Sequence, residues 1–151
     1  MKKQQHKRRK ERPRVVLDTN IYVSAFGFGG VPRQVFVLAE QENRITVAVS
    51  SHILAELEKA LQNKLGQPGD EIVDIRQRVT TTAKLINPKR QTNILSPASH
   101  PDNRILDLAV AFKADYLISG DRDLLDLEEY KGIPVLTPRQ FLNRLQAIKR
   151  E

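Results

Sequence analysis

The chain has 151 residues, 40% of them hydrophobic and 28% charged, which is typical of one globular domain with a substantial core. It contains no cysteine, which excludes disulfides, thiolate metal sites and cysteine nucleophiles. The net charge of +7 lies in the first residues, and no apolar stretch of signal-peptide type follows them. No apolar run approaches the ~20 residues that a membrane span needs. We therefore expect a cytoplasmic protein without a membrane partner.

The net charge comes entirely from the first 14 residues. They hold eight of the 25 Lys and Arg residues and only one of the 18 acidic residues, so the rest of the chain is neutral. We therefore expect a basic flexible arm over residues 1–13 and a globular domain over residues 14–151. Such an arm can bind phosphates by releasing counterions, or it can be a solvated tail. Its candidate nucleic-acid contacts are Lys7, Arg8, Arg9, Lys10 and Arg12.

The elements expected in the first half alternate between short apolar strands and helices. Residues 15–18 and 45–49 are apolar runs of the kind that form buried strands. A helix with Pro32 in its first turn follows the first run. Ser50 or Ser51 can cap the helix that follows the second.

The second half continues the alternation. Asp70 is expected to cap a helix that ends before Pro88, and residues 89–101 are expected to form a loop. Asp102 begins another helix, and Thr137 and Gln140 form a capping box for the last one. This pattern predicts an α/β fold with a parallel sheet covered on both faces. The remaining strands are expected at 94–95, 116–119 and 133–136.

Acidic residues stand where open parallel sheets form their sites, at the carboxyl ends of strands. Asp18 closes the first strand, Asp121 follows the fourth, and Asp102 begins the helix just before that strand. Clustered carboxylates repel one another unless a cation neutralises them, and Mg²⁺ or Mn²⁺ suits an all-oxygen site. Such a site can activate water and stabilise the charge that builds on a phosphodiester. Asp18 is difficult to explain otherwise, because an acid at a buried strand end is costly unless used.

The other acids leave alternatives open. Glu56 and Glu58 flank opposite sides of the apolar face of their helix, so the helical wheel does not decide which one joins the cluster. Glu56 could also be plain helix surface, and Asp102 could be a helix cap. Asp121 and Asp123 could be turn residues.

Several other features carry less weight. The chain has no P-loop, dinucleotide fingerprint or G-x-S-x-G motif. Asp107 lies about 140° round the helix from Asp102, so it should not join the same cluster. His100 could touch a substrate, although a loop histidine is more often polar surface.

Taken together, these motifs resemble the PIN domain. More narrowly, the chain resembles the VapC-like toxin components of bacterial toxin–antitoxin pairs. The resemblance runs from about Arg14 to the last helix. It rests on Leu17-Asp18-Thr19-Asn20, Glu56, Asp102-Asn103 and the segment YLISGDRDL from Tyr116 to Leu124.

The resemblance implies a three-layer α/β/α sandwich around a central parallel sheet of four or five strands. It also implies Mg²⁺- or Mn²⁺-dependent hydrolysis of RNA, a small antitoxin protein as partner, and a homodimer. Two other functions stay open, a catalytically silent PIN-like RNA-binding module and a structure-specific DNA nuclease. By the resemblance, the catalytic and metal-binding acids are Asp18, Glu56, Asp102 and Asp121, supported by Asn20, Ser119 and Asp123.

Overall fold

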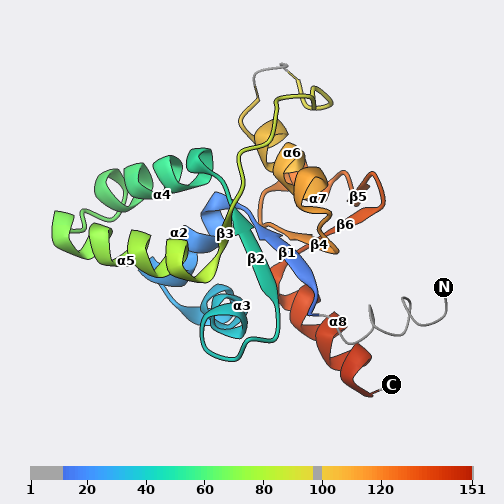
Figure 1. Cartoon of the computed structure of the whole chain (residues 1–151), viewed down its shortest axis with the longest axis horizontal. Coiled ribbons are helices and arrows are strands. Elements are labelled where there is room, and N and C mark those ends of the chain that lie inside the picture. The colour runs from blue at the N-terminus through green and yellow to red at the C-terminus, as the bar shows by residue number, and fades with distance from the viewer. Residues whose placement is uncertain (1–11, 97–99, 151) are drawn as a thin grey trace.

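The computed structural model describes residues 12–96 and 100–150, and it consists of a central sheet flanked by helices (Figure 1). Nearly all of the basic arm expected at residues 1–13, including Lys7, Arg8, Arg9 and Lys10, lies outside the described residues. In chain order the elements are β1 (Arg14–Leu17), α2 (Thr19–Gly27), α3 (Gly30–Glu40), β2 (Thr46–Val49), α4 (Ser51–Asn63), α5 (Gly69–Thr82), β3 (Lys84–Leu85), α6 (Asp102–Phe112), β4 (Tyr116–Ile118), α7 (Arg122–Leu125), β5 (Glu129–Tyr130), β6 (Ile133–Leu136) and α8 (Pro138–Arg150).

Over these residues the sheet has six strands in the order β3-β2-β1-β4-β6-β5. Every pair is parallel except β5 with β6, which is antiparallel. Val15 and Val16 of β1 pair with β2 on one side and β4 on the other, and both are fully buried. The expected α/β fold is confirmed, and the two-residue strands β3 and β5 bring the strand number above the four or five expected.

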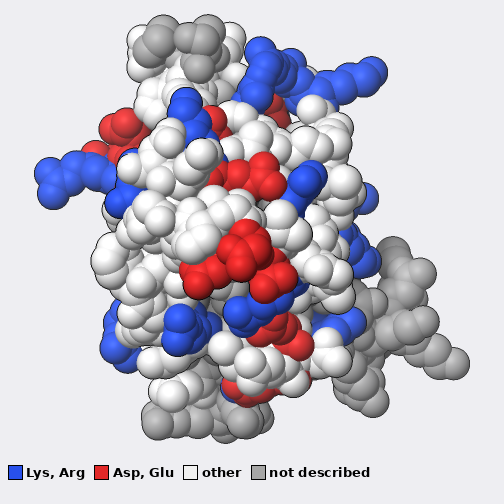
Figure 2. Space-filling view, turned by 90° about the vertical axis from the view of Figure 1, so that its left-hand side faces the viewer, with Lys and Arg blue, Asp and Glu red and all other residues white. Residues whose placement is uncertain are grey.

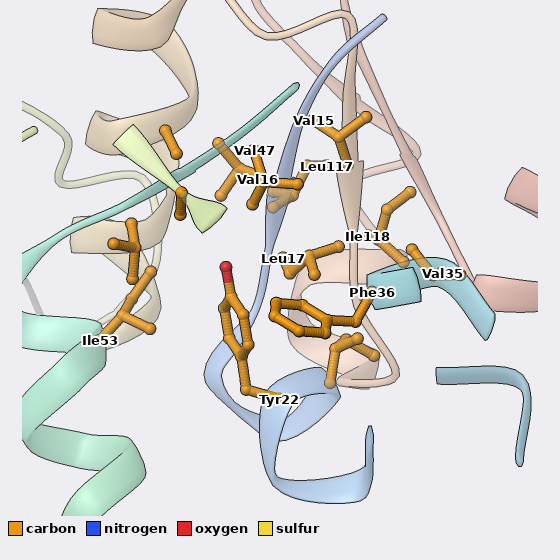
Figure 3. Packing of buried hydrophobic residues seen from close by; sticks show 14 of the residues in the cluster. Val15, Val16, Leu17, Tyr22, Val35, Phe36, Val47, Ile53, Leu117 and Ile118 are labelled. Atoms are coloured by element: carbon orange, nitrogen blue, oxygen red, sulfur yellow. The ribbon is translucent and has the colours of Figure 1, made fainter. Parts of the chain in front are cut away.

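The connections between strands place the helices in two layers. From β1 through β2 to β3 the chain moves one way along the sheet, and it then crosses back to β4. Right-handed crossovers therefore put α2 to α5 on one face and α6 on the other. Between the first of these layers and the sheet, Tyr22 and Phe36 pack edge to face with ring centroids 6.0 Å apart, beside Leu17 (Figure 3).

The third strand is the main error of the sequence-based prediction. It forms at Lys84–Leu85, where it pairs with Ala48 and Val49 of β2, and not at residues 94–95. The preceding helix ends early because Ala83 adopts an extended conformation, with φ −99° and ψ 152°. By pairing with the free edge of β2, residues 84–85 satisfy backbone N–H and C=O groups of β2 that would have no partner if the helix continued.

Two of the helix caps expected from the sequence are present, and one, at Asp70, is not. Ser50 Oγ accepts the N–H of Ile53 at 3.1 Å, as expected of a cap. Thr137 and Gln140 exchange the two hydrogen bonds of a capping box, at 2.9 and 3.1 Å. Asp70 is not a cap, because α5 begins one residue before it. Its charge instead lies in the first turn, where the helix dipole favours an acid.

Among the described residues, no single helix is long and apolar enough to cross a membrane. The helices α2 and α3 satisfy the criterion of length and composition only as a pair, and they bend by 101° where they meet. Much of their apolar surface, including Tyr22, Val35 and Phe36, is buried in the core.

The amino end of β1 is fastened by hydrogen bonds to the end of α6. The backbone N–H of Arg14 donates to Asp115 Oδ2 at 2.8 Å, and its Nε donates to the carbonyl of Phe112 at 3.0 Å. The guanidinium also lies 4.6 Å from the centre of the Phe112 ring. The chain therefore enters the domain at the amino edge of the sheet, opposite the end of β1 that leads to Asp18.

Candidate active site

Asp18 stands immediately after β1 at the carboxyl edge of the sheet. Its backbone N–H donates to the carbonyl of Ile118 at 2.9 Å, which places it beside the end of β4. The residue is only 3% exposed, and its Oδ2 accepts the hydroxyl of Ser119 at 2.8 Å. Burial raises the pKa of Asp18; the Ser119 hydroxyl opposes that rise, and the nearby charge of Asp121 adds to it. The fold around Asp18 therefore disfavours the ionised form of its carboxyl group.

Ser119 joins Asp18 to Asp121. Its fully buried hydroxyl donates to Asp18 and accepts the backbone N–H of Asp121 at 2.9 Å. The carboxylate of Asp121 accepts the N–H of Asp123 at 2.9 Å and so caps α7. Asp121, for which the sequence left open a turn position, is thus a helix cap that also lies beside Asp18.

Asp102 is the first residue of α6 and does not cap it, because Pro101 stands at the N-cap. Burial raises the pKa of Asp102 to about 7, and a hydrogen bond with the carboxyl group of Asp121 and the charges of Asp18 and Asp121 add to this effect. Its Oδ2 is buried and receives no hydrogen bond from the described part of the chain. The structure thus brings three of the four predicted acids together.

The structure also separates Glu56 from Glu58. Glu56 is exposed on α4 and lines a cavity of about 230 Å³ together with Asp18 and Asp102. Glu58 Oε1 instead lies 3.4 Å from Nε of Arg76 on α5. The helix α4 therefore turns Glu56 toward the acidic cavity and Glu58 toward its neighbouring helix.

The remaining wall of this cavity is polar and partly basic. The exposed Asn20 lines it, as do Lys59 of α4 and Lys64, which directly follows that helix. The sequence gives no reason to select these two lysines, because an exposed lysine on an amphipathic helix is ordinary surface. Their positive charges lie beside an acidic site, where they can attract the phosphates of a nucleic acid.

His100 lies within the acidic group and is not plain polar surface. Its Nδ1 accepts the backbone N–H of Asp102 at 3.1 Å, so the proton sits on Nε2, which donates to Asp123 Oδ2 at 3.1 Å. One ligand atom from each of His100, Asp102 and Asp123 lies within 4.8 Å of the others. This group shares Asp102 with the predicted acids, and it connects Asp123 to them.

The residues of the site suit a hard divalent cation. Their donors are carboxylate oxygens, which Mg²⁺ and Mn²⁺ prefer, whereas both ring nitrogens of His100 are already engaged by Asp102 and Asp123. The raised pKa values of Asp18 and Asp102 reflect burial and neighbouring negative charge, which a bound cation would offset. The buried Oδ2 of Asp102 has no hydrogen-bond partner in the described part of the chain, and such an ion would supply one.

Comparison with known proteins assigns the chain to a family. The family model for the PIN domain matches residues 14–123, a span that contains all four predicted acids. The chain belongs to the PIN domain family. PIN domains are generally nucleases, and they use divalent metal ions.

Two individual proteins are similar to this PIN domain protein. An uncharacterized protein of Methanocaldococcus jannaschii is 30% identical over 146 residues, which cover 88% of this chain and 92% of the relative. A chain in the crystal structure of VapBC2 from Rickettsia felis, bound to a DNA fragment from their promoter, matches with a TM-score of 0.54 and 17% identity. That match covers 81% of this chain and 96% of the other, and at such identity it concerns the fold alone.

Proposed function

We propose that this PIN domain protein is a Mg²⁺- or Mn²⁺-dependent endoribonuclease. The observation that carries the proposal is the crowding of Asp18, Asp102 and Asp121 at one edge of the sheet. Within residues 12–96 and 100–150, no Lys or Arg forms an ion pair with any of them. A site with excess negative charge attracts a divalent cation, and the cation can then engage a phosphodiester.

The side chains have distinct parts in this mechanism. Asp18, Asp102 and Asp121 would hold the cation, with Glu56 at the exposed side of the cavity. When bound, the ion supplies a water of lowered pKa and neutralises charge on the phosphate. Ser119 fixes the Asp18 carboxylate through their 2.8 Å hydrogen bond. Fixed positions matter, because catalysis depends on small displacements of the reacting groups.

We further infer that the protein acts as the toxin of a toxin–antitoxin pair, with RNA as substrate and a small antitoxin as partner. This inference draws on the sequence resemblance to VapC-like proteins and on the similar fold of the VapBC2 chain. The same resemblance underlies our proposal of a homodimer, and we also propose a cytoplasmic location.

The test is cleavage of single-stranded RNA by the purified protein with Mn²⁺. We expect Asp18→Asn and Asp121→Asn to lower the rate by about 100-fold or more, since losing a ligand carboxylate costs several kcal/mol at the transition state. Asp74→Asn on the exposed surface of α5 removes the same charge and should leave the rate unchanged. EDTA should stop the wild-type reaction.

The same assay distinguishes the alternatives. Wild-type rates in both Asp→Asn variants would reject the proposed site. Equal or faster cleavage of structured DNA would favour the DNA nuclease. Metal-independent RNA binding without cleavage would favour the silent binding module.

A further inference from the structure

A second cavity, of about 380 Å³, adjoins the acidic one. His52 lines both, so the two cavities meet at the first turn of α4. The second cavity lies where β2 and β3 end, on the side of the acidic cavity away from β4. The side chains that give it its chemistry are Ser51, His52, Asn87, Arg90, Arg104 and Asp107.

Arg104 is the central cation of this second cavity. Its guanidinium is half-buried, and Nη1 donates to Nδ1 of His52 at 2.9 Å. In the described part of the chain it forms no ion pair with a carboxylate. A guanidinium has five N–H donors, so several remain for another acceptor. A partly buried cation without an anionic partner is costly unless a ligand supplies one.

The acidic residue of this cavity does not neutralise Arg104. The two carboxylate oxygens of Asp107 accept the backbone N–H groups of Gln91 and Thr92 at 3.2 and 2.8 Å. Asp107 therefore fixes the loop that carries Arg90, and it lies apart from the catalytic acids, as its helical position predicts. The cavity keeps an excess of positive charge.

The start of α4 adds to that charge. Ser51 and His52 open this 13-residue helix at the wall of the second cavity, and the positive end of a helix dipole favours anions. On the face in Figure 2, Lys and Arg side chains of the described residues are intermixed with acidic ones and form no continuous basic surface.

We propose that the second cavity binds the phosphate and sugar of the RNA nucleotide next to the scissile bond, with Arg104 as its main contact. This proposal rests on the proposed ribonuclease function. An RNA strand that follows the carboxyl edge of the sheet from β1 toward β3 passes from the acids, over His52, into this cavity. The planar guanidinium can bind two phosphate oxygens at once, and His52 holds it in position.

The experiment measures RNA binding in the absence of cleavage. A fluorescent single-stranded RNA is titrated with the full-length chain carrying Asp18→Asn, in Mg²⁺, over a series of salt concentrations. We expect Arg104→Ala to weaken binding about tenfold, as for loss of a charge-assisted hydrogen bond. The slope of log affinity against log salt should fall by about 0.7, the value for one phosphate contact on a single strand. Arg104→Lys keeps the positive charge but loses the planar guanidinium that can bind two oxygens at once. Its affinity for RNA should therefore lie between that of the parent and that of Arg104→Ala.

The matched control is Arg33→Ala on α3. It removes the same charge, but Arg33 lines a different cavity, between α3 and α8. Affinity close to that of the parent is expected. As a second test, RNAs are lengthened one nucleotide at a time from a dinucleotide, at either end. Extension at one end should strengthen binding in the parent, and Arg104→Ala should abolish that gain.

Equal effects of Arg104→Ala and Arg33→Ala would overturn the proposal, as would a gain from extension that survives Arg104→Ala. Failure of the ribonuclease proposal is distinguishable. If the wild-type chain cleaves no RNA with any divalent metal while Arg104 still controls binding, the cavity stands as an RNA site without a neighbouring cleavage site. If cleavage occurs and Arg104→Ala leaves its KM unchanged, the cavity assignment alone is wrong.

Discussion

The two ends of strand β1 differ in how their polar groups are satisfied. At the amino end, Arg14 donates to both Asp115 and the Phe112 carbonyl, and its guanidinium stacks on the ring of Phe112. At the carboxyl end, the carboxyl groups of Asp18 and Asp102 are buried near other acids, and their pKa values are raised.

This difference assigns a role in stability to the amino end of the four-residue strand β1 and a role in function to its carboxyl end. The amino edge has the complementary partners that folding alone selects, and it needs no ligand. The carboxyl edge concentrates like charges, which destabilises the ligand-free protein and therefore requires another explanation. Binding of a cation supplies one. Changes at the carboxyl edge should thus affect activity first, and changes at the amino edge should affect stability alone.

Among the tests of this contrast, the largest effect is expected from Glu56 at the acidic cavity. Glu56→Gln should lower the rate of RNA cleavage by about 100-fold, because it removes a carboxylate facing the metal site. Glu58→Gln, whose residue pairs with Arg76, should change the rate less than twofold and is the matched control. Initial rates at saturating Mn²⁺ decide the matter, and the reverse ranking would show that Glu56 does not serve the metal.

The next effect concerns the basic segment that precedes the amino edge. Residues 2–12 contain seven Lys and Arg residues. Deleting them should leave turnover at saturating RNA unchanged but weaken binding at low salt, and the slope of log affinity should fall by about 0.7 for each phosphate that the segment neutralises. Binding of single-stranded RNA over a salt series measures this. Identical slopes for the full-length and shortened chains would mean that the segment is a solvated tail.

A smaller effect is expected from pH on the metal-free protein. The pKa of Asp102 is about 7 in the folded state against 3.8 for an unperturbed aspartate. Its contribution to stability is therefore fully present below pH 3.8 and is lost as the pH rises from there through 7. With EDTA, the Tm should therefore fall between about pH 4 and about pH 7 on this account and level off at higher pH. Asp102→Asn should flatten that decline, and so should Mg²⁺. A decline of equal size in Asp102→Asn would assign it to another group.

The smallest effect is expected at the amino edge. Asp115→Ala removes the carboxylate that accepts the N–H of Arg14, which should lower stability by about 1 kcal/mol, or the Tm by roughly 2–4 °C. The rate of RNA cleavage at 25 °C should stay the same. Thermal unfolding and initial rates measured on one preparation check both statements, and a large loss of activity would contradict the contrast between the two edges.

Most of the fold could be predicted because its long elements carry periodic signals. The apolar runs of β1 and β2 and the capping box at Thr137 and Gln140 needed no tertiary information. The two-residue strands could not be predicted, since Lys84 and Leu85 are strand only because Ala48 and Val49 offer a free edge. Pairing of this kind depends on the neighbouring strand and leaves no local pattern.

The candidate site shows the same division. The strand-end rule correctly placed Asp18 beside Asp121, while the choice between Glu56 and Glu58 depended on the packing of α4 against α5. The pairing of His52 with Arg104 spans 52 positions, so no motif could reveal it. Sequence spacing identifies residues that lie together at the carboxyl ends of strands. It does not identify residues that come into contact only because helices pack against one another or against the sheet.

The hydrogen bond between Asp18 and Ser119 joins residues 101 positions apart, across β1 and β4. Such non-local parallel pairing forms late in folding, because the intervening chain must first be closed into a loop. On the proposed ribonuclease function, a chain still being synthesised would lack the site until β4 and Asp121 have left the ribosome, so it would not cut the messenger that encodes it. The same dependence makes activity a reporter of the finished domain: in a denaturant titration, cleavage and sheet structure should disappear together.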